Sequence, residues 1–213
     1  MAESIDFTTG GAKRIGLIVR GKLGPDHHPD KMAQHADCIL ANGAPTGFFG
    51  EGNDQSGNAI GLRMAGIVYD YAKLQINRPY YVDKDQAVTA RVVSTVLLID
   101  VDQTTADLFA KAWSDMTLHP GDFNIVGGNC ASHASAAFIK AKIVSSSIPW
   151  LDTPDNLYGQ LVEKVPAGKR RSITGFFGFT PKGGGYVMTW EPYTDSPKAN
   201  RPNPGKSGSS SSN

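Results

Sequence analysis

Cysteine is scarce in this chain of 213 residues, which has only Cys38 and Cys130. Two cysteines exclude a disulfide framework, and their spacing matches no zinc-binding motif. The one disulfide that the chain allows joins these two residues. We expect both thiols to be free, because a chain without an export signal is made in a reducing compartment.

The chain also lacks an excess of charge of either sign, with 21 Lys and Arg against 20 Asp and Glu. It therefore has no net field that would favour nucleic acid or an acidic membrane surface. No apolar run is long enough to span a bilayer. Residues 1–6 are acidic and polar, unlike a secretory signal. We expect no nucleic-acid partner, no stable membrane insertion, no cofactor and synthesis in the cytoplasm.

The length suits a single domain. We expect residues 1–13 to be a loose lead-in and residues 14–193 to fold. The Pro-, Gly- and Ser-rich residues 194–213 are predicted to be disordered.

The pattern of apolar residues predicts both strands and helices. Strands are predicted over residues 14–20, 35–41, 46–51, 67–71, 88–101, 172–179 and 186–191. A helical start near residues 85–87 remains an alternative for part of the fifth run. Helices are predicted through residues 106–116, from Cys130 onward, and from Pro154 behind a Thr153 cap.

The stretch from Gly127 to Ala134 predicts a sharp turn into a helix, with a cysteine at its start. Asn129 is a favourable N-cap residue, since its side-chain oxygen accepts a hydrogen bond from the first helical turn. Cys130 then lies where open N–H groups and the helix dipole favour negative charge, which lowers a thiol's pKa. The sequence thus predicts a nucleophilic thiolate. The alternative is a small buried cysteine that only packs the helix.

A cysteine nucleophile needs a histidine, and His35 opens a predicted strand. Because side chains alternate along a strand, His35 and Asp37 share one face, and Cys38 points to the other face as a core residue. If the following turn centres near Gly43, Glu51 lies opposite His35 and its carboxylate orients the imidazole. The alternative role for Glu51 is a surface salt link.

The other histidines are weaker candidates. His119 is expected at a helix C-terminus, and His133 lies one turn after Cys130 on the same helix, where alignment with the thiol is difficult. His27 and His28 are flanked by aspartates but lack a third ligand at a helical spacing, so we predict no metal site.

The order of these parts resembles the circularly permuted papain-like hydrolases, which are related to the NlpC/P60 families and place histidine before cysteine. The resemblance rests on residues 35–49, on the Asn-Cys helix start within residues 123–134, and on residues 149–157. It covers about residues 14–161. It implies an α+β papain-like fold, in which a small antiparallel sheet packs against the helix that starts at the cysteine.

The resemblance also implies a function. Cys130 is expected to be the nucleophile and His35 the base of a cysteine peptidase or amidase, with Glu51 as the third, less constant position. The similar bacterial toxins are often type VI secretion effectors that cleave peptidoglycan peptides. They imply delivery to a target-cell periplasm without a signal peptide, a cognate immunity protein and a secretion-machine component. The alternatives are a lipid or ester hydrolase or acyltransferase on the same fold, and a non-enzymatic binding module.

Overall fold

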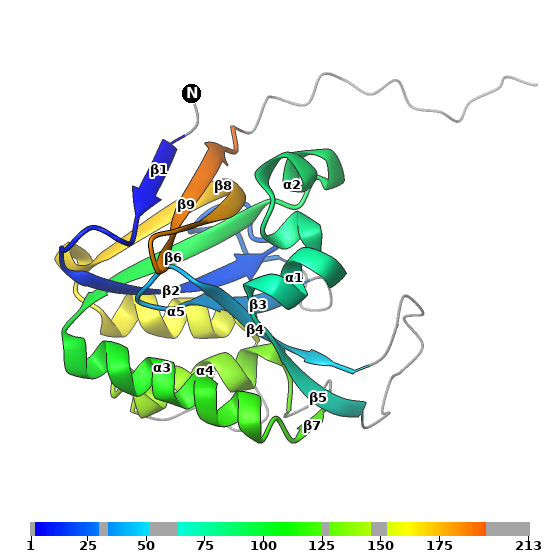
Figure 1. Ribbon diagram of the computed structural model, residues 1–213. Helices are drawn as coiled ribbons and strands as arrows, with labels where there is room; N and C mark the ends of the chain where they lie inside the picture. The colour runs from blue at the N-terminus through cyan, green and yellow to red at the C-terminus, as the bar shows by residue number, and fades with distance from the viewer. Residues whose placement is uncertain (1–2, 30–33, 52–63, 125–127, 146–152, 195–213) are drawn as a thin grey trace, which may run out of the picture.

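A computed structural model describes residues 3–29, 34–51, 64–124, 128–145 and 153–194. Within these ranges the chain is α+β, with nine strands in one antiparallel sheet of order β1-β9-β8-β6-β2-β3-β4-β5-β7 (Figure 1). The strands are β1 (Glu3–Asp6), β2 (Lys13–Arg20), β3 (His35–Ile39), β4 (Pro45–Gly50), β5 (Met64–Tyr69), β6 (Ser94–Val101), β7 (Asp122–Phe123), β8 (Arg170–Lys182) and β9 (Gly185–Pro192). The α-helices are α1 (Tyr71–Asn77), α2 (Lys84–Ala90), α3 (Gln103–Leu118), α4 (Cys130–Lys140) and α5 (Pro154–Lys164), and two short 3₁₀ helices are η2 (Pro79–Tyr81) and η3 (Ala167–Lys169).

Each of these α-helices begins at a residue whose side chain accepts a hydrogen bond from the first turn. These N-cap residues are Asp70, Asp83, Asp102, Asn129 and Thr153. The helices therefore start where the sequence offers a short polar side chain, which satisfies an N–H group that has no partner inside the helix.

The sheet has an apolar core on each face, because strands such as β2 and β6 carry apolar side chains in both directions. Helices α3, α4 and α5 cover one face, where Phe109, Phe138 and Leu161 belong to a single buried cluster (Figure 1). The other cluster contains Ile18 and Phe177 and is closed in part by α1. No helix among the described residues is long and apolar enough to cross a membrane.

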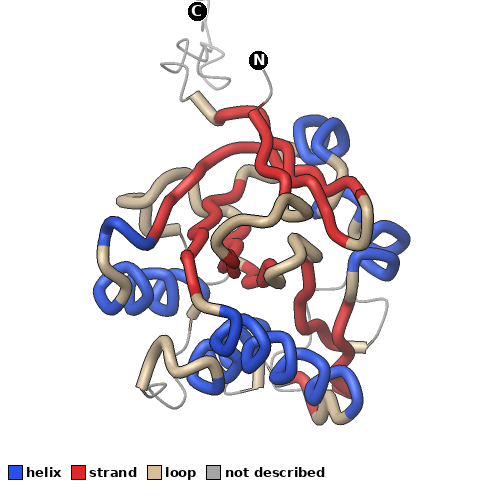
Figure 2. The backbone as a smooth tube through the Cα atoms, turned by 60° about the vertical axis from the view of Figure 1, so that its left-hand side comes forward, coloured by secondary structure: helices blue, strands red, loops and turns tan. Residues whose placement is uncertain are grey.

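The sheet curves strongly around the cluster that contains Ile18 and Phe177, as the red strands in Figure 2 show. The tip of the β8–β9 hairpin reaches the β3–β4 turn, where the N–H of Tyr186 donates to the carbonyl of Asn42 at 2.8 Å. The N–H of Phe179 likewise donates to the carbonyl of Val82 at 2.8 Å. These bonds join segments that are far apart in the strand order, so the concave face is partly enclosed.

The predicted elements are confirmed in type, with three corrections. The lead-in contains β1, which pairs with β9, so these residues are part of the sheet and not a loose segment. The run from residue 88 is divided, since α2 ends at Ala90 and β6 begins only at Ser94. The sheet is also large, not small. Most of the predicted tail and residues 52–63 lie outside the described residues.

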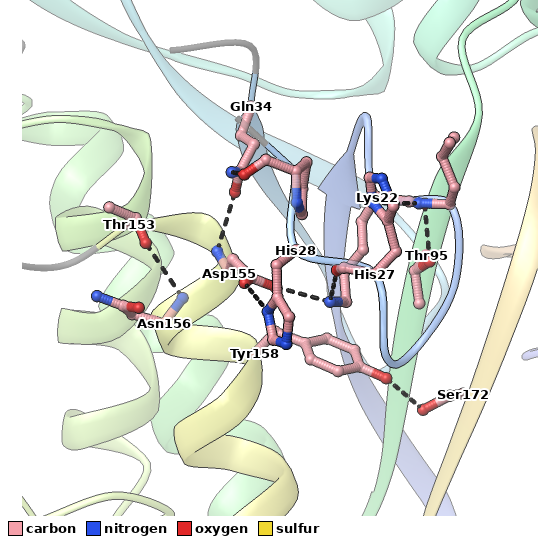
Figure 3. A network of polar contacts seen from close by, with 12 residues as sticks. Lys22, His27, His28, Gln34, Thr95, Thr153, Asp155, Asn156, Tyr158 and Ser172 are labelled. Atoms are coloured by element: carbon pink, nitrogen blue, oxygen red, sulfur yellow. Dashed lines mark hydrogen bonds and ion pairs between the residues drawn. The ribbon is translucent and has the colours of Figure 1, made fainter. Parts of the chain in front are cut away.

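A buried lysine attaches the loop after β2 to helix α5 (Figure 3). The side chain of Lys22 is 1% exposed, and its ammonium group lies 2.7 Å from Asp155 Oδ1. It also donates to the carbonyl of His27 and lies 4.7 Å from the centre of the Tyr158 ring. Gln34 continues the connection, because its side-chain oxygen accepts from the N–H of Asp155 at 3.1 Å. The segment that leads into β3 is therefore fixed to α5.

We predict that Asp155→Asn destabilises the protein by about 3 kcal/mol, because it leaves the buried Lys22 charge without its anion. Urea unfolding followed by circular dichroism measures the change. Asp115→Asn is the matched control, since Asp115 pairs with Lys111 at 2.8 Å on an exposed helix face and should matter little. Equal losses in the two variants would contradict the role of Lys22 in stability.

Candidate active site

Helix α4 presents Cys130 at its first position. The Asn129 side chain accepts from the N–H of Ser132 at 3.0 Å, and the Ser132 hydroxyl accepts from the N–H of Asn129 at 2.8 Å. This reciprocal pair is a capping box. It confirms the predicted cap and fixes the backbone at the cysteine. Gly127, the first residue of the predicted turn, lies outside the described residues.

The Cys130 thiol is nearly buried, at 7% exposure, and it faces the beginning of β3. The N–H of Ala36 donates to Cys130 Sγ at 3.4 Å. Burial opposes ionisation of the thiol, but the charge of the His35 imidazolium and its hydrogen bond to the sulfur outweigh burial and lower the pKa of Cys130. The structure thus brings together the two residues that the sequence predicts as nucleophile and base.

His35 is held by a carboxylate on its own strand. Its Nε2 lies 2.8 Å from Oδ1 of Asp37. Burial disfavours the charged imidazole, but the negative charges of Cys130 and Asp37 outweigh burial and raise the pKa of His35. The ring also stacks on Phe49, with centroids 4.3 Å apart. The arrangement favours a thiolate–imidazolium pair, which is the reactive form of a cysteine nucleophile.

Asp37 is fully buried and is bound on both oxygens. Its Oδ2 accepts from Nε of Arg20 at 2.8 Å, while Oδ1 faces His35. Burial raises a carboxyl pKa, but the charges of His35 and Arg20 outweigh it and lower the pKa of Asp37. Asp37 is therefore an ionised carboxylate that is fixed in one orientation.

Gly47 makes room for this carboxylate. Residue 47 lies directly opposite Asp37 in the β3–β4 pairing. A Cβ atom at residue 47 would lie 2.1 Å from Asp37 Oδ1, far inside van der Waals contact. The contact between Asp37 and His35 therefore requires a glycine at residue 47 of β4.

The prediction that Glu51 orients His35 is wrong in its register. The β3–β4 pairs are Asp37 with Gly47 and Ile39 with Pro45, which places Phe49, not Glu51, next to His35. Glu51 is exposed and follows the end of β4. The orienting carboxylate belongs to Asp37.

The physical reason lies in the turn. Leu40 and Ala44 close a three-residue loop, with the N–H of Leu40 donating to the carbonyl of Ala44 at 2.9 Å. Its last residue, Gly43, has a φ of 84°, as a turn followed by a bulge requires. The turn therefore centres on Asn42, one residue earlier than expected. A one-residue shift of the centre moves every cross-strand partner by two residues.

The other histidines have different surroundings. His119 is exposed and is the C-cap of α3, as predicted. His133 stacks on Phe48 with centroids 3.4 Å apart, and its Nδ1 lies 3.0 Å from the carbonyl of Asn129. Burial lowers the pKa of His133. This ring packs the base of α4 as a neutral group.

The His27 and His28 pair takes part in the Lys22 network and not in a ligand cluster (Figure 3). His28 Nδ1 lies 2.8 Å from Asp155 Oδ2, and His27 Nδ1 accepts from the N–H of Leu23 at 3.3 Å. Within the described part of the chain, no three His, Cys, Asp or Glu side chains are grouped to hold a metal ion. Cys38 is a free, buried thiol in the core, as predicted.

No protein-family model, curated protein or solved structure matches this chain.

We predict that Gly47→Ala displaces the Asp37 carboxylate and costs about 1–3 kcal/mol of stability through overpacking. Iodoacetamide labelling of Cys130 at about pH 6, read by peptide mass spectrometry, should slow because the imidazolium loses its anion. Gly159→Ala is the control, since a Cβ there meets nothing within 4 Å. Unchanged labelling in a folded Gly47→Ala variant would contradict the role given to this glycine.

Proposed function

We propose that the protein is a cysteine-dependent amide hydrolase in which Cys130 is the nucleophile and His35 is the general base and acid. The observation that carries the proposal is the contact chain from Cys130 through His35 to the buried Asp37. A thiol at a helix start, an imidazole beside it and an anion behind the imidazole are the three parts of an activated nucleophile.

In the proposed reaction the Cys130 thiolate attacks the carbonyl carbon of the substrate amide. A carbon–sulfur bond forms, and the carbonyl oxygen becomes an oxyanion near the open N–H of Cys130. The imidazolium of His35 then gives its proton to the leaving amine, and the carbon–nitrogen bond breaks. His35 next takes a proton from water, which attacks the thioester and releases the acid and the thiolate. Asp37 holds the ring for both proton transfers.

The permuted papain-like assignment belongs to this proposal. Its support is the order of the parts, because the histidine strand β3 precedes the cysteine helix α4, and α4 packs on the sheet next to β3. The nine-stranded sheet is larger than the resemblance implies.

The proposed substrate class is a peptide amide of peptidoglycan, as in the bacterial effectors that the sequence resembles. Such a role would place the protein in a target-cell periplasm and would call for an immunity protein in the producing cell. The support for this step is the sequence resemblance alone.

We predict that Cys130→Ala and His35→Ala each abolish hydrolysis and that the double variant is no worse, because a nucleophile and its base act as one unit. The test incubates the protein with purified peptidoglycan fragments and identifies the products by mass spectrometry. Parallel ester substrates distinguish an esterase from an amidase. His119→Ala is the control, since this exposed residue caps a helix elsewhere.

The pH dependence of Cys130 alkylation follows from the two pKa shifts. Because the pKa of Cys130 is lowered and that of His35 is raised, the ion pair is populated between the two values. Labelling should stay fast below the ordinary cysteine pKa of about 8.5 and decline only below the lowered pKa of Cys130. In His35→Ala the labelling midpoint should move upward. Slow labelling at every pH would instead identify a structural thiol and refute the hydrolase.

A further inference from the structure

We propose that Arg20 is a positioning residue of the active site: it fixes the Asp37 carboxylate from behind and so sets the orientation in which His35 meets Cys130. This inference rests on the function proposed above. It adds a fourth residue to the contact chain, one that touches neither the substrate nor the reacting atoms.

The strand register brings Arg20 to this place. Arg20 is the last residue of β2 and lies opposite His35 in the β2–β3 pairing, while Asp37 lies opposite Ile18. Opposite residues in a sheet share a face, so all three polar side chains point to the concave side. Arg20 reaches Asp37 diagonally, on the neighbouring strand and two residues along from its direct partner His35.

The two oxygens of the Asp37 carboxylate bind different partners. Nε of Arg20 and one terminal nitrogen each lie 2.8 Å from Oδ2 of Asp37, and Oδ1 lies 2.8 Å from His35 Nε2. Rotation of the carboxylate would break one set of bonds or the other. A charge-assisted bond on each oxygen therefore fixes both the carboxylate and the ring.

Arg20 is itself immobilised. Its side chain is 4% exposed, it donates to the carbonyl of Tyr81 at 3.1 Å, and its guanidinium lies 4.3 Å from the centre of the Tyr81 ring. The same ring stacks on His35, with centroids 5.7 Å apart. A lysine at residue 20 would keep the charge but has no planar fork to bind Asp37 and the Tyr81 carbonyl together.

The groups that face His35 set the direction of the expected effect. They are Asp37 on its own strand, Arg20 on β2, Cys130 on α4 and Tyr81 in η2. Burial raises the pKa of Tyr81, so its phenol stays neutral. When Arg20 no longer holds Asp37 in place, the carboxylate is less well oriented and binds the imidazolium less firmly. A less stable imidazolium disfavours the Cys130 thiolate.

The experiment measures iodoacetamide labelling of Cys130 in the full chain at about pH 6 and about pH 9, read by mass spectrometry of the Cys130 peptide. In Arg20→Lys the labelling midpoint should shift upward by about one pH unit, which is a tenfold change in the equilibrium constant for ionisation of the thiol, and the ratio of the low-pH rate to the high-pH rate should fall accordingly. Unfolded protein exposes Cys130 as an ordinary thiol with a pKa of about 8.5 and would also lower the ratio, so both rates are taken on protein whose folding has been verified. Arg20→Gln provides a second variant, with folding checked by near-ultraviolet circular dichroism.

A double-mutant cycle tests whether Arg20 acts through Asp37. In an Asp37→Asn background, Arg20→Lys should cause no further change in the ratio, because the group through which it acts has been altered. Effects that simply multiply would overturn the proposal.

Arg14→Lys is the matched control. Arg14 lies on the same strand and pairs with Asp100 at 2.7 Å, but both side chains are about 40% exposed. The ratio should not change in this variant, and an equal fall would overturn the proposal. An unchanged ratio in Arg20→Lys, with hydrolysis intact in the wild type, would refute the positioning role and leave the hydrolase standing. A wild type without fast labelling at low pH would refute both.

Discussion

Asp37 carries a full negative charge at a position without exposure to water, and the rest of the site follows from how that charge is accommodated. An isolated buried carboxylate is costly, so it must be paired and hydrogen-bonded on both oxygens. Arg20 satisfies one oxygen and His35 the other. The space for the carboxylate comes from Gly47, which has no side chain. One buried charge therefore determines an arginine, a histidine and a glycine on three neighbouring strands.

The fold brings Cys130 to this group from the other face of the sheet. Cys130 belongs to the core under α3, α4 and α5, whereas Phe49, which stacks on His35, belongs to the core on the concave side. Cys130 and His35 come together at the beginning of β3, where the N–H of Ala36 donates to the Cys130 sulfur. A strand end suits this meeting, because a side chain there can reach around the backbone instead of through a continuous sheet. The Lys22 network and Gln34 fix the segment just before it.

The sequence predicts local features of the site better than its pairings. The helix start at Cys130 was predictable because Asn129 is a strong local cap, and the strand beginning at His35 follows from alternation. The sequence predicts Glu51 only if the turn centres near Gly43, whereas the loop closed by Leu40 and Ala44 centres one residue earlier and so changes every cross-strand partner. Asp37 was visible two residues after His35 on the same strand face, and this spacing was the signal for the orienting carboxylate. Arg20 had no local signal, since its role depends on the β2–β3 register.

The unpredicted strand β1 and the boundary between α2 and β6 also depend on contacts beyond the local sequence. The segment of residues 3–6 is short and mostly polar, and it forms β1 only because the edge of β9 is available for pairing. The division between α2 and β6 depends on Asp83, whose side chain caps α2, and on Arg91, which ends it in a left-handed conformation with a φ of 55°. Edge pairing is a tertiary effect, and a left-handed arginine is rare enough that the sequence pattern does not predict it.

The charges of the site alternate along the contact chain, and this alternation connects stability to reactivity. Arg20 is positive, Asp37 negative, His35 positive and Cys130 negative in the ion-pair state. Each charge lowers the cost of burying its neighbours, so the four are neutral together although each alone would be unfavourable. Loss of a proton from His35 alone, or gain of one by Cys130 alone, leaves an uncompensated charge in a site that is largely buried from solvent. The interactions that stabilise the folded site are thus the same interactions that keep the thiol ionised. A substitution among these four residues that stabilises the fold without preserving the alternating charges should therefore reduce the fraction of Cys130 present as thiolate.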